Sequence, residues 1–336
     1  MATDRKYKVK SRMVNNVKLK KTIKLFLSVI LLAYIAYYIA NNTDEFLKLK
    51  DIKWHQILQM YVVTCLLLCV IGVRLLNIMR VYGLKQISFI EWVRIYMLAR
   101  FFNYFVPQAG SIYRAVKLKE EYGFTYLKYL TSFLAFTWMD AITILLTVSM
   151  MLFVFEKTFI VAGIPAYLLS LASLLLVIFI PITFSLLAKG MFNEQSALSK
   201  TLYKFSSFID VMNSPVLILK QLALSILSFL LYVYLLYICS ISISVEIPIS
   251  MLVIFSAIIK LSTYIVITPG NIGINELALG YLSIGSNLEF GDGIMISGIS
   301  RLIIYISTIT LGCIFGGIPM VKELFSYDNN LNKGIS

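Results

Sequence analysis

Two long apolar stretches of this chain are each interrupted by proline and glycine, and each interruption is followed by one charge at the same distance. The first interruption lies in residues 100–110 and is followed by Arg114, whereas the second lies in residues 267–273 and is followed by Glu276. In both cases the charged residue comes seven positions after the proline. Interrupted apolar segments at matching places in two halves of a chain are typical of a transporter site near the bilayer midplane.

The composition predicts an integral membrane protein. Hydrophobic residues make up 59% of the 336 residues and charged residues 14%, and the mean hydropathy is +0.84. A soluble domain of this size needs more polar residues to cover its surface. A span needs about 20 apolar residues, and six stretches are long enough. They are residues 23–40, 56–73, 130–155, 160–187, 220–243 and 294–318. The first has no small-residue cleavage site after it, so we interpret it as a retained span.

The distribution of basic residues predicts the orientation in the membrane. The basic tail of residues 1–22 and the loop of residues 188–220 are rich in Lys and Arg and should be cytoplasmic. The short links near Glu156 and Glu246 carry little positive charge and should face outward. We therefore expect a multi-pass protein of the cell membrane whose C-terminal tail, residues 319–336, is cytoplasmic as well. The net charge of +13 sits at membrane edges, where anionic lipids attract it, so we expect no nucleic-acid partner.

The two interrupted stretches are predicted to be re-entrant helical hairpins. Residues 89–126 follow a loop with Arg74, Arg80 and Lys85, which we expect to be cytoplasmic, and precede a span that starts on the same side. Residues 249–288 lie between two spans that meet on the outer side. Two alternatives stay open: residues 89–126 as a pair of interfacial amphipathic helices, and residues 249–288 as one full span followed by a short surface helix.

The predicted fold is all-α, with six transmembrane helices and two re-entrant hairpins in an inverted-topology repeat. The first repeat is residues 23–155 and the second, inverted repeat is residues 160–318, and we call them the first and second halves. An odd number of crossings in each half inverts the second copy. Irregular backbone at membrane depth is tolerated where it is buried in protein or lines a wet cavity. The two hairpin tips should therefore meet inside the molecule.

Both halves place charges at equivalent positions with opposite signs. Asp140 lies 33 residues after the first proline, and Arg301 lies 32 residues after the second. Four charges in lipid are costly unless they are paired, so we expect Arg114, Asp140, Glu276 and Arg301 to converge, with at least one acid–base pair between the halves. The arginines could bind a phosphate and the carboxylates an amine. The alternatives are purely structural ion pairs, an Arg114 that reaches to the headgroups, and a Glu276 stabilised by a helix N-terminus.

The residues around the interruptions complete the predicted substrate-binding set. Both second arms begin at the tips, where free backbone N–H groups suit an anion, and Ser111 and Asn275 are candidate helix caps. The remaining candidate residues are Asn103, Pro107, Gly110, Pro269, Gly270, Gly273 and Tyr305.

The sequence offers little for metal binding or acid–base catalysis. His55 is the only histidine, and the four cysteines all fall within apolar spans. We therefore expect no metal, no cofactor and no catalytic residues of the Ser-His or Cys-His type.

The two interrupted motifs resemble a known family. The run from Leu98 to Asp140 resembles the first signature of the lysylphosphatidylglycerol synthase transmembrane region, also called the flippase-like domain family, and the run from Pro269 to Ala278 with Arg301 resembles the second. The resemblance implies a membrane protein related to translocases of aminoacylated phospholipids. Asn271 departs from the family pattern, since a second glycine is usual there. The segment ThrTrpMetAsp at 137–140 departs as well, because it lacks a basic residue before the aspartate.

The function that we expect is a lipid translocase that moves an anionic or zwitterionic phospholipid, or a polyprenyl-phosphate lipid, between leaflets. We expect no enzyme activity, since the chain stops some 18 residues after the last span and leaves no room for the soluble aminoacyl-transfer domain of synthase relatives. An ion-coupled transporter of a small soluble anion and an accessory protein of lipid headgroup modification stay open. The expected partners are membrane lipids, and both a homo-oligomer and a separate lipid-modifying enzyme stay open as further partners.

Overall fold

A computed structural model describes most of the chain. The described residues are 26, 29–84, 86–106, 108–155, 160–161, 163–191, 214–264, 268–285 and 288–317. They are nearly all helical, in agreement with the predicted fold class.

Four helices in the described part are long and apolar enough to cross a membrane. They are α3 (Trp54–Val81), α6 (Tyr126–Phe155), α9 (Pro215–Ser242) and α12 (Phe290–Ile314). The helix Val29–Asn41, residues Ala166–Ile180 of α7 (Ala166–Met191) and α10 (Ile249–Ser262) are shorter and also apolar. The chain is therefore a multi-pass membrane protein.

One predicted span begins later than the sequence indicated. Residues 160–165 were assigned to a span, but Ile160–Val161 (β1) and Ile164–Pro165 (β2) pair as two short antiparallel strands. Gly163 lies between them with a φ of +80°, which a residue without a side chain adopts easily. A tight turn therefore occupies this segment, and the helix begins only at Ala166.

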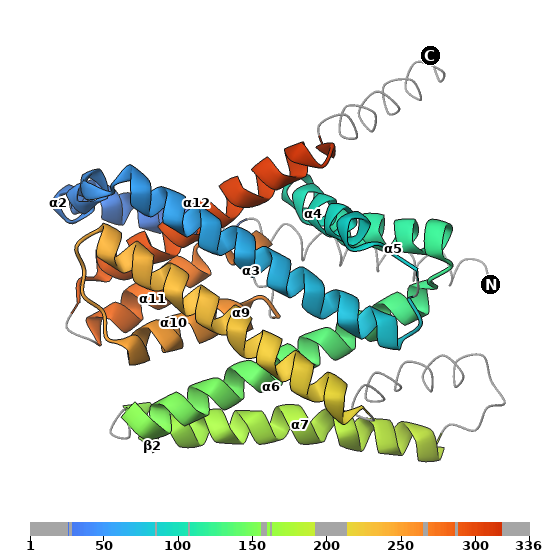
Figure 1. Cartoon of the computed structure of the whole chain (residues 1–336). Helices are drawn as coiled ribbons and strands as arrows, with labels where there is room; N and C mark the ends of the chain where they lie inside the picture. Colours follow the sequence, from blue (N-terminus) through green and yellow to red (C-terminus); the bar gives the residue numbers. More distant parts are fainter. Residues whose placement is uncertain are drawn as a thin grey trace, which may run out of the picture.

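Each interrupted stretch forms a helical hairpin. The first consists of α4 (Phe89–Phe105) and α5 (Ala109–Tyr122), and the second of α10, the 3-10 turn η3 (Pro269–Asn271) and α11 (Ile274–Ile284). In Figure 1 the α4–α5 hairpin lies near the end of the bundle where α3 ends, and the α10–α11 hairpin near the end where α3 begins. The arms of each hairpin pack against each other, α4 also packs on α12, and α10 also packs on α6.

The largest buried cluster joins the two halves. It contains Met60 of α3, Ile144 of α6, Phe229 of α9, Phe255 of α10 and Ile296 of α12. The opposite faces of the long helices carry exposed apolar side chains, such as Leu66, Leu146, Leu230 and Leu302. Apolar residues therefore lie both in the core and on the outer surface, as expected for helices surrounded by lipid.

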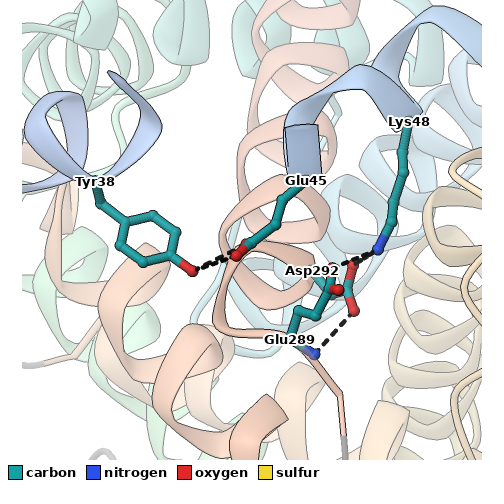
Figure 2. A network of polar contacts seen from close by, with 5 residues as sticks. All are labelled: Tyr38, Glu45, Lys48, Glu289 and Asp292. Carbon is teal, nitrogen blue, oxygen red and sulfur yellow. Dashed lines mark hydrogen bonds and ion pairs between the residues drawn. The ribbon is translucent and has the colours of Figure 1, made fainter. Parts of the chain in front are cut away.

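A cluster of polar side chains connects residues 38–48 with the start of α12. It joins the 3-10 helix η1 (Leu47–Asp51), which follows α2 (Thr43–Phe46), to the first turn of α12. The Nζ of Lys48 lies 2.7 Å from an oxygen of Glu289 and 2.9 Å from one of Asp292, as Figure 2 shows. Burial alone lowers the pKa of Lys48, but the two carboxylates raise it above its ordinary value. Beside them, the hydroxyl of Tyr38 donates to Glu45 at 2.9 Å.

Candidate functional site

A cavity of about 870 Å³ lies where the two hairpins meet the long helices. Helices of both halves contribute to its wall, including α3, α4, α5, α6, α9, α10 and α12. Six predicted site residues line it, namely Asn103, Arg114, Asp140, Gly270, Arg301 and Tyr305. Gly110, Gly273 and Glu276 are buried next to this lining. Pro269 is the first residue of η3, and Pro107 lies outside the described residues.

Arg301 holds the tip of the second hairpin in place. Its Nε lies 2.8 Å from an oxygen of Glu276, and its two terminal nitrogens donate to the carbonyls of Gly270 and Asn271 at 2.9 and 3.2 Å. The second oxygen of Glu276 accepts a hydrogen bond from the N–H of Gly273 at 2.7 Å. The charges of this pair therefore balance each other, and together they bind the backbone of the interruption to α12.

Asp140 forms an ion pair with Arg74, which the sequence predicted to lie in a loop. Arg74 was expected in a cytoplasmic loop, but α3 continues to Val81 and leaves Arg74 inside the helix, with 1% of its side chain exposed. One of its nitrogens lies 2.6 Å from Asp140, and another donates to the hydroxyl of Ser228 on α9 at 3.0 Å. The guanidinium therefore joins α3, α6 and α9.

The expected acid–base pair between the halves is not formed among the described residues. Arg74–Asp140 joins two helices of the first half, and Arg301–Glu276 joins two helices of the second. Each carboxylate reaches an arginine within its own half and is satisfied there. In the cavity, tyrosines of the two hairpins make contacts between the halves, in addition to the hydrogen bond of Arg74 to Ser228. Tyr264 donates to Asp140 at 2.8 Å, and the rings of Tyr104 and Tyr305 meet edge to face at 4.6 Å.

Three cations of the lining form no ion pair with a described carboxylate: Arg100, Arg114 and Lys260. Lys260 lies within electrostatic range of Asp140 without pairing with it. Arg114 is 6% exposed, and its Nε donates to the hydroxyl of Tyr129 at 3.1 Å. The guanidinium groups of Arg114 and Arg100 lie 5.6 and 5.8 Å from the centre of the same ring, that of Tyr96. The Nζ of Lys260 lies 5.5 Å from the ring of Tyr232. The cavity therefore carries an excess of positive charge.

Comparison with known proteins identifies the family. Residues 22–312 match the family described as the lysylphosphatidylglycerol synthase TM region. The chain belongs to this family. The resemblance seen in the two interrupted motifs is thereby confirmed. No curated protein and no solved structure matches the chain.

The first signature of the lysylphosphatidylglycerol synthase TM region forms the tip of the first hairpin. The side-chain oxygen of Asn103 accepts a hydrogen bond from the N–H of Gly110 at 2.8 Å. Ser111 was expected to cap α5, but Gln108, in the left-handed region with a φ of +69°, occupies the cap position without a capping side chain. Ser111 lines the cavity instead.

The second signature of the family forms the turn that Arg301 binds. Asn271, which replaces the usual glycine, has a φ of +50°. Asn tolerates this left-handed region better than most residues, and its side-chain amide donates to the carbonyl of Ser262. Asn275 was expected to cap α11, but the cap is Gly273, and the side-chain oxygen of Asn275 is buried without a hydrogen-bond partner. The departure from the family pattern therefore keeps the backbone conformation of the turn.

Sequence reasoning missed Arg74, Arg100 and Lys260 as parts of the site. All three are basic residues inside or beside apolar stretches, which is the signal that could have found them. The structure shows no group of three or more His, Cys, Asp or Glu residues in the described ranges that could hold a metal.

Proposed function

We propose that this chain moves a phosphate-bearing lipid between the leaflets of the cell membrane through the central cavity. The observation that carries the proposal is the set of three cations that line the cavity without a carboxylate partner in the described residues, Arg100, Arg114 and Lys260. Charged groups in a membrane interior are costly and mark substrate pathways. A phosphate offers several charged acceptors to such donors.

The packing of the helices supports an inverted repeat of six spans and two re-entrant hairpins. When α3, α4, α5 and α6 are exchanged with α9, α10, α11 and α12, each packing pair among these eight helices has a counterpart, although α11 packs on α12 far more extensively than α5 packs on α6. For example, α4 on α12 becomes α10 on α6, and α3 on α6 becomes α9 on α12. The helix Val29–Asn41 packs on α12 through Ile35, just as α7 packs on α6. Two related halves account for this correspondence.

Alternating access follows from this architecture. If the first hairpin opens to the cytoplasm and the second to the outside, each leaflet has its own entrance to the cavity. The tips touch the opposite half through uncharged tyrosines, Tyr264 on Asp140 and Tyr104 on Tyr305. Such contacts are cheaper to break than a buried ion pair. Rocking of the halves against each other leaves the Arg74–Asp140 and Arg301–Glu276 pairs closed. The contacts of Arg74 with Ser228 and of Lys48 with Glu289 and Asp292, which also join the halves, have to rearrange in this motion.

The same residues argue against covalent chemistry by this chain. The two carboxylates of the site are candidates for a general acid or base, but Asp140 and Glu276 are both held in ion pairs. We therefore propose a transport role, with membrane lipids as the partners and both termini in the cytoplasm.

The test is lipid movement by the purified full chain in vesicles. The lipid is a phospholipid with a fluorescent label on one acyl chain, and a membrane-impermeant reductant bleaches the label in the outer leaflet. Wild type should bring labelled lipid from the inner leaflet to the outer leaflet, where the reductant bleaches it. Arg114→Ala should slow this movement at least about tenfold, since a hydrogen bond to a charged group is worth at least that factor. Lys117→Ala, on the same helix but outside the cavity lining, should match wild type.

Two results would replace the proposal. If wild type moves no lipid but accumulates a soluble anion inside the vesicles, the chain is a solute transporter. Lipid movement that is equally fast in Arg114→Ala would show that the route lies elsewhere.

A further inference from the structure

We infer that the cavity selects a net-anionic headgroup that carries hydroxyl groups and no amine, such as a phosphoglycerol or a phosphosugar. The anion is bound by Arg100, Arg114 and Lys260. The inference rests on the proposed function, because it concerns the same cavity. It narrows the substrate from any phosphate-bearing lipid to one charge class.

The three cations line the same cavity. Arg100 and Arg114 lie on the two arms of the first hairpin and both approach the ring of Tyr96. Lys260 of the second hairpin lies within electrostatic range of Asp140 and Arg74 as well as of Arg100. The Nε of Arg100 is buried without a hydrogen-bond partner, and the terminal nitrogens of Arg114 make no hydrogen bond to the described residues. Donors without a partner on neighbouring positive side chains point to a negatively charged ligand. Such a ligand would accept the hydrogen bonds and would offset the repulsion between the cations.

An amine finds no free carboxylate in the described part of the cavity. One oxygen of Asp140 is bound by Arg74 and the other by Tyr264. Both oxygens of Glu276 are occupied as well, by Arg301 and by the N–H of Gly273. A carboxylate oxygen can accept more than one hydrogen bond, but an ammonium group at Asp140 would have to join Arg74 and Lys260, whose charges already face this carboxylate. A zwitterionic or cationic headgroup would therefore leave its amine unpaired among cations.

The rest of the lining suits hydroxyl groups. Asn103, Ser111, Thr137, Thr263 and Asn275 bring side-chain donors and acceptors to the cavity, and the oxygen of Asn275 has no hydrogen-bond partner. The volume of about 870 Å³ lies within the range of about 300–1,000 Å³ that is usual for small-molecule sites. The cavity thus has room for more than a bare phosphate.

The experiment compares two lipids that differ only in the headgroup. Phosphatidylglycerol and phosphatidylethanolamine with the same acyl-chain label are offered to wild-type vesicles, to Arg114→Gln and Lys260→Gln, and to Arg114→Lys, which keeps the charge. Lys117→Gln is the control outside the lining. In parallel, each purified protein is melted in detergent with either lipid, since a ligand that binds the folded state raises the melting temperature. Soluble glycerophosphate is tested in the same two assays.

Wild type should move phosphatidylglycerol about tenfold faster than phosphatidylethanolamine. Of the two lipids, phosphatidylglycerol alone should raise the melting temperature of wild type. Both Gln variants should bring the ratio towards one, while Arg114→Lys and Lys117→Gln keep the preference. Equal rates for the two lipids, or a preference that survives both Gln variants, would overturn the inference and leave lipid transport standing. If no lipid moves but phosphatidylglycerol still stabilises wild type and not Arg114→Gln, the anion site stands and the transport proposal fails. Stabilisation and uptake with glycerophosphate alone would assign the site to a free phosphate ester.

Discussion

Gly110 sets how closely the two arms of the first hairpin approach each other. A Cβ at this position would lie 1.5 Å from the carbonyl oxygen of Ala99 and 2.9 Å from the side-chain oxygen of Asn103. The backbone of α5 therefore lies directly against α4, and Asn103 can accept the N–H of Gly110. This close approach keeps Arg100 and Arg114 beside the same tyrosine ring.

Gly110→Ala should destabilise the protein by about 1–3 kcal/mol, the usual cost of extra volume in a packed core. The obstacle is backbone, which cannot rotate away as a side chain can. The matched control is Gly298→Ala on α12, where a Cβ would meet nothing within 4 Å. Because Ala favours a helix over Gly by about 1 kcal/mol, this control should be neutral or stabilising. Thermal unfolding in detergent measures both, and equal melting temperatures for the two variants would contradict the role given to Gly110.

The tip of the second hairpin is held by an ion pair, and its second arm also approaches the backbone of α12 closely, where a Cβ at Gly293 would lie 2.3 Å from the carbonyl oxygen of Leu279. Arg301 uses its whole guanidinium group on Glu276 and on the two carbonyls of the turn. Glu276 in turn fixes the N–H of Gly273. Both charges therefore contribute to the conformation of the turn.

Glu276→Ala and Arg301→Ala should each cost about 3–5 kcal/mol of folding free energy, because each strands the charge of the other. The double variant should cost clearly less than the sum of the two. The control is the exposed pair of Lys117 and Glu121 one turn apart on α5, where single Ala variants should cost less than about 1 kcal/mol. Denaturant unfolding in micelles gives the four values of the cycle. Strict additivity would mean that the two residues act independently.

The sequence predicted the two helical hairpins well, but it did not predict which charged side chains pair with each other. The interruptions near Pro107 and Pro269 identified both hairpins, because a break in an apolar pattern is a local signal. The pairing of Arg74 with Asp140 could not be predicted, since it depends on where α3 ends and on the reach of two side chains in space. The same holds for Lys260, whose position in the cavity follows from the packing of α10 on α6.

At the scale of the whole molecule, the correspondence between the two halves explains why the cavity is central. The last long helix of each half, α6 or α12, contacts the hairpin of the other half. Both hairpin tips are thereby brought to one place, although they start from opposite ends of the bundle, as Figure 1 shows. The proposed transport between leaflets requires a single site that both hairpins reach.

The inverted repeat predicts that the bases of the two hairpins face opposite sides of the membrane. Glu120 lies near the end of α5, Glu246 lies between α9 and α10, and both are exposed. Glu120→Cys should react with a membrane-impermeant thiol reagent only from the cytoplasmic side, and Glu246→Cys only from the outer side. Wild type gives the background, because its own four cysteines lie within apolar helices. Labelling is compared in intact cells and in inverted membrane vesicles. If both variants react from the same side, the hairpins open to one face, and neither the inverted repeat nor alternating access through opposite entrances can hold.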